Sequence, residues 1–130
     1  MRLNQITIPV RNIGRSKSFY MRLGFRLLVD SPHYSRFLAP DGDTTFSLHL
    51  SEEPVAPGAV IYLECEKVDK EVARLRERGF KFETEPEDMG WLWREAILLD
   101  PDGHKIKIYH AGKNRIDPPW RVKPEKARAD

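Results

Sequence analysis

Ten polar and aromatic side chains fall at alternating positions of strand-like segments, where they would share one face of a sheet. Two of them are carboxylates, Glu64 and Glu95, and a carboxylate whose pKa is raised by burial can act as a general base. His49 offers an imidazole, which can bind a metal ion or form a structural hydrogen bond. The predicted lining of this face is Gln5, Thr7, Ser47, His49, Tyr62, Glu64, Trp93, Glu95, Lys107 and Tyr109.

A lysine on the same predicted face favours an ion pair over a free catalytic carboxylate. If Leu99 pairs with Lys105 across a turn, Ile97 lies opposite Lys107 and Glu95 lies opposite Tyr109. Lys107 is then the expected partner of Glu64 or Glu95. The rings of the predicted face, Tyr62, Trp93 and Tyr109, could stack on a flat ligand or fill space with their polar tips in water.

The segments that carry these side chains belong to two copies of one sequence plan. Residues 3–25 and 58–80 each predict a strand with period-two alternation, followed by a helix that ends at a glycine. Leu-Gly-Phe at 23–25 matches Arg-Gly-Phe at 78–80, an offset of 55 residues. In the second copy the phase of the strand turns Cys65 toward the helix, which predicts a core position.

Each copy then closes with a tight hairpin. Pro40-Asp41-Gly42 and Pro101-Asp102-Gly103 are turn signals, each between two strand-like runs. Each copy therefore predicts a βαβββ module, whose helix covers only one face of its sheet. We predict an α+β fold in which two tandem βαβββ modules form one curved, cupped mixed sheet with the helices outside.

The same patterns set the expected boundaries. We predict a single domain over residues 1–112, with modules at 1–50 and 58–112 and an acidic, proline-containing linker between them. A tail follows at 113–130, in which Trp120 is expected to anchor onto the body or onto a partner subunit.

Composition excludes several classes of protein. A chain of 130 residues with 40% hydrophobic residues fits one globular domain. The 22 basic and 20 acidic residues leave a net charge of +2, and the basic excess lies in the tail, so nucleic acid is not an expected partner. There is no apolar run of about 18 residues and no leader pattern, and there is one cysteine. These features predict a cytoplasmic protein without a membrane partner.

Several short motifs in this order resemble a known family. The first half has Ile-Pro-Val, Ser-x-x-Phe-Tyr and Leu-Gly-Phe, and the second half has Val-Asp, Arg-Gly-Phe and Asp-Pro-Asp-Gly-His. Together with the tandem modules they resemble the glyoxalase, bleomycin-resistance and extradiol-dioxygenase superfamily, the vicinal oxygen chelate proteins. The resemblance covers about residues 1–112 and implies a homodimer with a small-molecule site in the cup.

The resemblance also implies a divalent metal ion, such as zinc, nickel, iron or manganese, that polarises substrate oxygens. Carried over to this sequence, the ligand positions of the first module fall on Gln5 and His49. Those of the second module fall on Val60, which has no donor atom, and on Lys107, whose positive charge would repel a cation. Glu64 or Glu95 would have to replace the missing ligands.

Two functions therefore stay open. We expect the chain to bind a small organic molecule in the cup. It would act either as a metal-dependent lyase, isomerase or dioxygenase with a non-standard ligand set, or as a metal-free binding protein of the bleomycin-resistance type. In the second case Lys107 would serve as a counter-charge for an anionic ligand. A sensor that passes ligand binding on to another protein is a third possibility.

Overall fold

The structure is a computed structural model that describes residues 1–123. Its first module contains β1 (Gln5–Val10), α1 (Ile13–Leu23), β2 (Arg26–Asp30), β3 (Tyr34–Leu38) and β4 (Thr45–Leu50). Its second module contains β5 (Val60–Glu64), α2 (Val68–Glu77), β6 (Glu87–Asp88), β7 (Arg94–Leu99) and β8 (Lys105–His110), followed by the 3₁₀ helix η1 (Gly112–Arg115). The two tandem βαβββ modules predicted from the sequence are confirmed.

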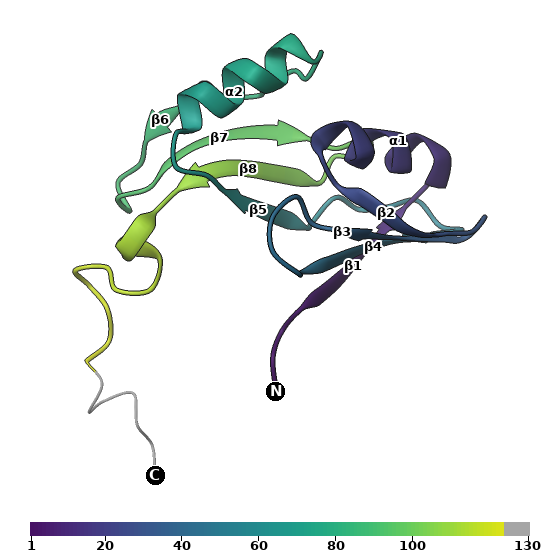
Figure 1. Cartoon of the computed structure of the whole chain (residues 1–130), viewed down its shortest axis with the longest axis horizontal. Coiled ribbons are helices and arrows are strands. Elements are labelled where there is room, and N and C mark those ends of the chain that lie inside the picture. The colour runs from purple at the N-terminus through teal and green to yellow at the C-terminus, as the bar shows by residue number, and fades with distance from the viewer. Residues whose placement is uncertain (124–130) are drawn as a thin grey trace.

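Each module builds one mixed sheet of four strands, and the two sheets form an open, curved surface. The strand order is β1-β4-β3-β2 in the first module and β5-β8-β7-β6 in the second, with β1–β4 and β5–β8 parallel and the other pairs antiparallel. Hydrogen bonding does not continue from β1 to β5, so within residues 1–123 each of these strands has a single hydrogen-bonded neighbour strand. Both helices lie on one side of the sheets, and the described ends of the chain lie on the other (Figure 1).

Strand alternation decides which side chains meet the helices. Phe46 and Leu48 of β4 are buried on the helix side with Ile8 and Val10 of β1.

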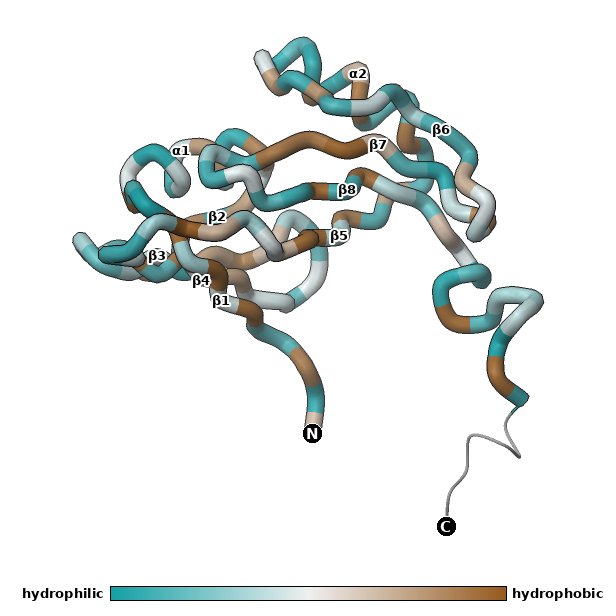
Figure 2. The backbone as a smooth tube through the Cα atoms, turned by 180° about the vertical axis from the view of Figure 1, so that it is seen from behind, coloured by the Kyte–Doolittle hydropathy of each residue, from teal (hydrophilic) through white to brown (hydrophobic). Residues whose placement is uncertain are grey.

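The predicted register of the last hairpin is confirmed, with Glu95 opposite Tyr109 and Ile97 opposite Lys107. Figure 2 shows the hydrophobic part of β7 in brown beneath α2, which packs against β7 and β8.

Ile6 departs from the predicted pattern. The alternation of β1 predicts that it packs under a helix, but its side chain is 53% exposed. Ile6 instead lines an open pocket between the two modules.

The two helices begin for different local reasons. Asn12 caps α1, because its Oδ1 accepts a hydrogen bond from the backbone N–H of Arg15 at 2.9 Å. The first turn of α2 carries Asp69 and Glu71, whose charges favour the positive end of the helix dipole. At its other end α1 is closed by Gly24, whose φ of 120° is unfavourable for other residues.

A buried polar joint fastens the second module to the first. The hydroxyl of Tyr20 on α1 donates a hydrogen bond of 2.7 Å to Oδ2 of Asp100, in the turn between β7 and β8. In the same turn His104 Nε2 lies 3.1 Å from the carbonyl oxygen of Pro9, and His104 Nδ1 accepts from the N–H of Ala59 at 3.3 Å. Tyr20, Asp100 and His104 are all buried, and burial together with the charge of Asp100 raises the pKa of the Tyr20 hydroxyl.

The segment after β8 differs from the predicted tail. The part at 112–115 forms η1. Trp120 is 57% exposed, so it does not anchor onto the body of this chain. Residues 124–130, the rest of the predicted tail, lie outside the described residues. Among the helices of residues 1–123, none is both long and apolar enough to cross a membrane.

We predict that Tyr20→Phe lowers the free energy of unfolding by about 1–3 kcal/mol, because it leaves the buried Asp100 carboxylate without its hydroxyl donor. Urea unfolding followed by circular dichroism measures this change. The control is Tyr62→Phe, whose side chain is 48% exposed and whose hydroxyl loss should cost no more than about 0.5 kcal/mol. Equal effects of the two substitutions would contradict a structural role for the joint.

Candidate ligand-binding face

Four aromatic rings gather on the second module, on the sheet face away from α2. We call Tyr62, Trp91, Trp93 and Tyr109 the aromatic face. Trp93 stacks on Tyr109 with ring centroids 4.6 Å apart, and Tyr62 stands edge-on to both at 6.0 and 5.7 Å. Tyr109 is buried, whereas Tyr62 and Trp91 are partly exposed. The exposed rings therefore offer a surface on which a flat molecule could stack.

An ion pair lies within the aromatic face. Lys107 Nζ is 3.1 Å from Glu95 Oε2, and both side chains are largely buried. The indole N–H of Trp91 donates to the other oxygen, Glu95 Oε1, at 3.1 Å. The Lys107 ammonium lies 5.5 Å from the ring centre of Tyr62 and 5.7 Å from that of Trp91, within range of cation–π attraction. The predicted pairing of Lys107 with a carboxylate is confirmed, and the partner is Glu95.

A strained turn positions Trp91. Leu92 has a φ of 67°, a left-handed conformation that leucine rarely adopts. The turn is held by two backbone hydrogen bonds, from Met89 N to Trp93 O and from Leu92 N to Met89 O. Residues held in such conformations often occur at functional sites. Here the turn brings Trp91 back over Glu95.

A polar network occupies the corresponding sheet face of the first module. Arg36 Nε donates to the Tyr34 hydroxyl at 2.9 Å, and that hydroxyl lies 2.7 Å from Ser47 Oγ. The bond with Ser47 and the nearby Arg36 guanidinium lower the pKa of the Tyr34 phenol, against the opposing effect of burial. At the end of this network Thr45 Oγ1 donates to Gln5 Oε1 at 2.7 Å.

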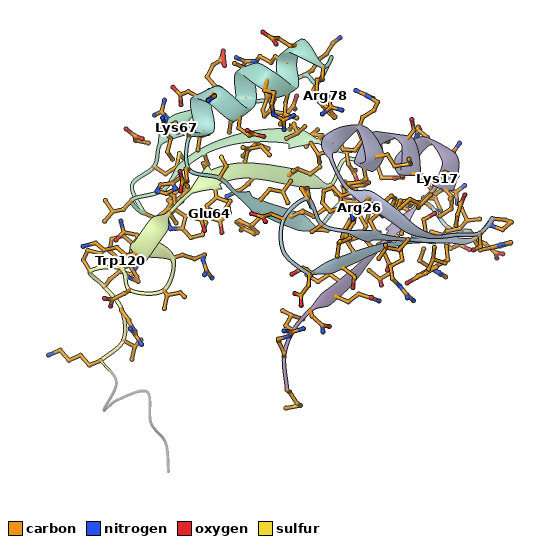
Figure 3. All side chains as sticks on the ribbon, viewed as in Figure 1. Lys17, Arg26, Glu64, Lys67, Arg78 and Trp120 are labelled. Carbon is orange, nitrogen blue, oxygen red and sulfur yellow. The ribbon has the colours of Figure 1, made fainter. Side chains whose placement is uncertain are left out.

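Glu64 lies at the edge of the aromatic face and binds backbone. Its Oε2 accepts hydrogen bonds from the N–H groups of Ala111 and Gly112, at 2.8 and 3.0 Å, and Arg115 lies 3.7 Å from Oε1. Figure 3 shows Glu64 beside the end of β8, where the chain turns into η1. Burial alone would raise the pKa of Glu64, but these N–H groups and Arg115 outweigh it and lower the pKa. Such a carboxylate is a weak base, and it stabilises the turn.

The fold and this arrangement can now be compared with known proteins. The sequence model of the Glyoxalase/Bleomycin resistance protein/Dioxygenase superfamily matches residues 2–108. The chain belongs to this superfamily. A comparison with curated protein sequences found no match.

Solved structures of the superfamily share the fold. A glyoxalase/bleomycin resistance protein/dioxygenase from Nocardioides has a TM-score of 0.78 at 20% identity, covering 95% of this chain and 90% of its own. A superfamily member from Sphaerobacter thermophilus DSM 20745 has a TM-score of 0.70 at 28% identity, with coverage of 85% and 97%. A bleomycin-binding protein complexed with bleomycin has a TM-score of 0.68 at 21% identity, with coverage of 85% and 98%.

The metal site that the superfamily resemblance implies does not fit the residues of this chain. The parallel register sets Gln5 opposite Thr45 and His49 opposite Pro9. Gln5 and His49 are thus four residues apart along the strands, about 13 Å at 3.3 Å per residue. The structure does not bring the two predicted ligands together. In the second module the side chain of Val60 has no donor atom, and Lys107 forms an ion pair with Glu95.

No other metal site is evident in the described part of the chain. Within residues 1–123, no group of three or more histidine, cysteine, aspartate or glutamate side chains could hold a metal ion. Neither predicted catalytic carboxylate is free, because Glu95 is paired with Lys107 and Glu64 with backbone N–H groups.

Most residues predicted to line the cup lie on the expected sheet faces. In the second module Tyr62, Trp93, Glu95, Lys107 and Tyr109 come together. In the first module Gln5, Thr7 and Ser47 share a face, but Ser47 is fully buried because Tyr34 covers its hydroxyl, while Thr7 stays exposed.

The sequence reasoning missed Trp91 and the role of Arg36. Trp91 lies outside the strands, so alternation could not place it. Arg36 and Tyr34 could be placed only once the register of β3 against β4 was known, which sets Arg36 opposite Ser47. The available sequence signal for Trp91 was its position two residues before Trp93, which an extended chain would place on the same face.

The lowered pKa of Glu64 gives a pH-dependent prediction. Because the pKa is lower in the folded protein, the ionised carboxylate stabilises the fold above about pH 4.3, and this stability is lost as the pH falls through the folded pKa. We expect Glu64→Gln to be less stable than the natural chain at pH 7, and the difference to shrink in acid. Thermal unfolding between pH 3 and 7 tests this, with the exposed linker residue Glu52→Gln as control. A difference independent of pH would contradict the assigned role.

Proposed function

We propose that this superfamily member binds a small, flat organic molecule on the aromatic face without a metal ion. The observation that carries the proposal is the ion pair of Lys107 and Glu95, which lies against the rings of Tyr62 and Trp91. A ligand would lie against the exposed rings of Tyr62 and Trp91. The stacked pair of Trp93 and Tyr109 contacts the Tyr62 ring edge-on.

The charge of the site favours a neutral ligand. Lys107 is one of the two positions in the second module where the superfamily resemblance implies a metal ligand, and its ammonium takes the place of a cation there. Because Glu95 neutralises it, the pair as a whole carries no net charge. An anionic ligand would have to compete with Glu95 for Lys107. Lys107 is therefore a structural part of the aromatic face and is not free to act as a counter-charge for a ligand.

Two further observations support this choice. One structural neighbour is described as a bleomycin-binding protein in complex with bleomycin, which suits a binding function on this fold. The proposal also includes a homodimer, which the superfamily resemblance implies. The exposed apolar side chains of Leu28 and Val29 on the edge strand β2 support such an interface.

Quenching of tryptophan fluorescence by flat compounds tests the proposed site. Riboflavin serves as a neutral flat probe, flavin mononucleotide as its anionic counterpart, and bleomycin as a third probe. We expect riboflavin to quench the natural chain and Trp91→Ala to weaken its binding roughly threefold to tenfold, as expected for the loss of one stacked ring. The control is Trp120→Ala, which removes an exposed tryptophan outside the aromatic face. Equal binding by natural chain and Trp91→Ala, or tighter binding of the anionic flavin, would contradict the proposal.

Elemental analysis tests the metal-free part separately. Protein purified without a tag or chelators should contain no stoichiometric zinc, nickel, iron or manganese, and His49→Ala should give the same result. The reason is the poor donor set at Gln5, His49, Val60 and Lys107. A stoichiometric metal that disappears in His49→Ala would overturn the proposal and would favour lyase or dioxygenase chemistry.

A further inference from the structure

The internal repeat predicts two equivalent joints between the modules, but only one of them is closed. In the closed joint the turn at 100–104 of the second module reaches α1 of the first, where Asp100 binds Tyr20. The repeat relates this turn to the turn at 39–43 of the first module, which should reach α2 of the second. The closed joint therefore serves as a reference for the other one.

Residue exchanges at equivalent positions have removed the polar contacts from the second joint. At the offset of 55 residues, Tyr20 corresponds to Leu75 on α2, and at the offset of 61 residues between the turns, Asp100 corresponds to Ala39. The buried His104 corresponds to Asp43, whose side chain is 75% exposed. The Tyr20 phenol, the His104 imidazole and the Asp100 carboxylate, which fill the closed joint, thus have no counterparts in the second joint.

A pocket occupies the second joint. Its volume is about 470 Å³, which lies within the range of small-molecule sites. Ala39 and Leu75 both line it, which shows that it lies where the equivalent of the Tyr20–Asp100 contact would be. Its apolar wall comes from both modules and includes Ile6, Ile8, Phe46, Ile61 and Leu63. These side chains lie on the helix side of the sheets, because they alternate with those of the aromatic face and the polar network. Tyr62 and Glu64 of β5 also line the pocket, so it borders the aromatic face along that strand.

The rim of the pocket is acidic. Ser16 and Asp102 form a hydrogen bond in the closed joint, and their equivalents here are Glu71 and Asp41, two carboxylates that both line the pocket. Glu71 is paired with Arg74 on the same helix. Asp41 forms no ion pair with any residue of 1–123. A third carboxylate of the lining, Glu64, is bound by backbone N–H groups and by Arg115. Among the described residues, Asp41 is thus the carboxylate of the pocket that has no ion-pair partner.

We propose that this open joint is a second ligand site, which borders the aromatic face at Tyr62 and binds a small apolar molecule carrying a protonated amine. The apolar body of the ligand fills the space left by the exchange of Tyr20 for Leu75. Its ammonium group lies at the rim beside Asp41. An anionic molecule of the same shape is repelled by that carboxylate.

The single cysteine of the chain reports on this site. Cys65 lines the pocket and is half-buried. Burial and the nearby Glu71 raise the pKa of its thiol, so we expect slow modification by methyl methanethiosulfonate. A ligand in the pocket should protect it. The probes are 4-phenylbutylamine, 4-phenylbutanol and 4-phenylbutyrate, which share one apolar body and differ in charge.

We expect 4-phenylbutylamine to slow the modification of Cys65 about tenfold at ten times its Kd. The alcohol should protect more weakly, and the carboxylate should not protect at all. Equal protection by amine and carboxylate would overturn the assignment of the charge. Failure of all three probes to protect Cys65 would overturn the site.

A variant that rebuilds the contacts of the closed joint in the open joint provides a second test of the proposal. The double substitution Leu75→Tyr with Ala39→Asp builds the Tyr20–Asp100 pair into the open joint and should abolish protection by the amine. Asp41→Asn should reduce the preference for the amine without filling the pocket. The matched control is Met21→Tyr, which adds the same side chain at an exposed helix position outside the pocket.

Two measurements keep the outcomes distinct. Quenching of tryptophan by riboflavin should be unchanged in the filled variant, so loss of the aromatic face and loss of the open joint are separable. Protection of Cys65 that rises with protein concentration, without any probe, would assign the pocket to a second copy of the chain and overturn the proposal. Unchanged protection by the amine in the filled variant would also overturn it.

Discussion

The buried carboxylate of Asp100 is the contact on which the arrangement of the two modules depends. It accepts the Tyr20 hydroxyl through one oxygen and the backbone N–H groups of Asp102 and His104 through the other. A buried charge is tolerable only when its hydrogen-bonding capacity is used in this way. The same contacts fix the turn between β7 and β8, and so the register that sets Glu95 beside Lys107.

The aromatic face shows how one substitution can change the chemistry that a fold allows. A metal site needs neutral or negative donors that converge on a point. At Lys107 this chain has a cationic side chain, and that charge is satisfied by Glu95 and by the rings of Tyr62 and Trp91. In the structure the cation at this position is the Lys107 ammonium, and the rings of Tyr62 and Trp91 lie beside it.

The fold could be predicted from the sequence because its signals are local and repeated. Alternation, the glycines that end the helices and the two Pro-Asp-Gly turns each act within a few residues, and together they placed Glu95 opposite Tyr109. The ligand pair of Gln5 and His49 could not be tested in this way, because its geometry depends on the parallel register of β1 with β4. Trp91 could not be placed either, since its position follows from a left-handed turn at Leu92.

The asymmetry between the two joints explains why sequence repeats do not give a symmetric molecule. At the closed joint, large polar side chains from both modules interlock and exclude water. At the other, the equivalent positions carry Leu75 and Ala39, which are too small and too apolar to do so. The strand β5 has β8 as its hydrogen-bonded neighbour and presents Tyr62 to the aromatic face and Leu63 to the pocket. Because alternate residues of one edge strand form the walls of both, a shift of β5 alters the two surfaces together.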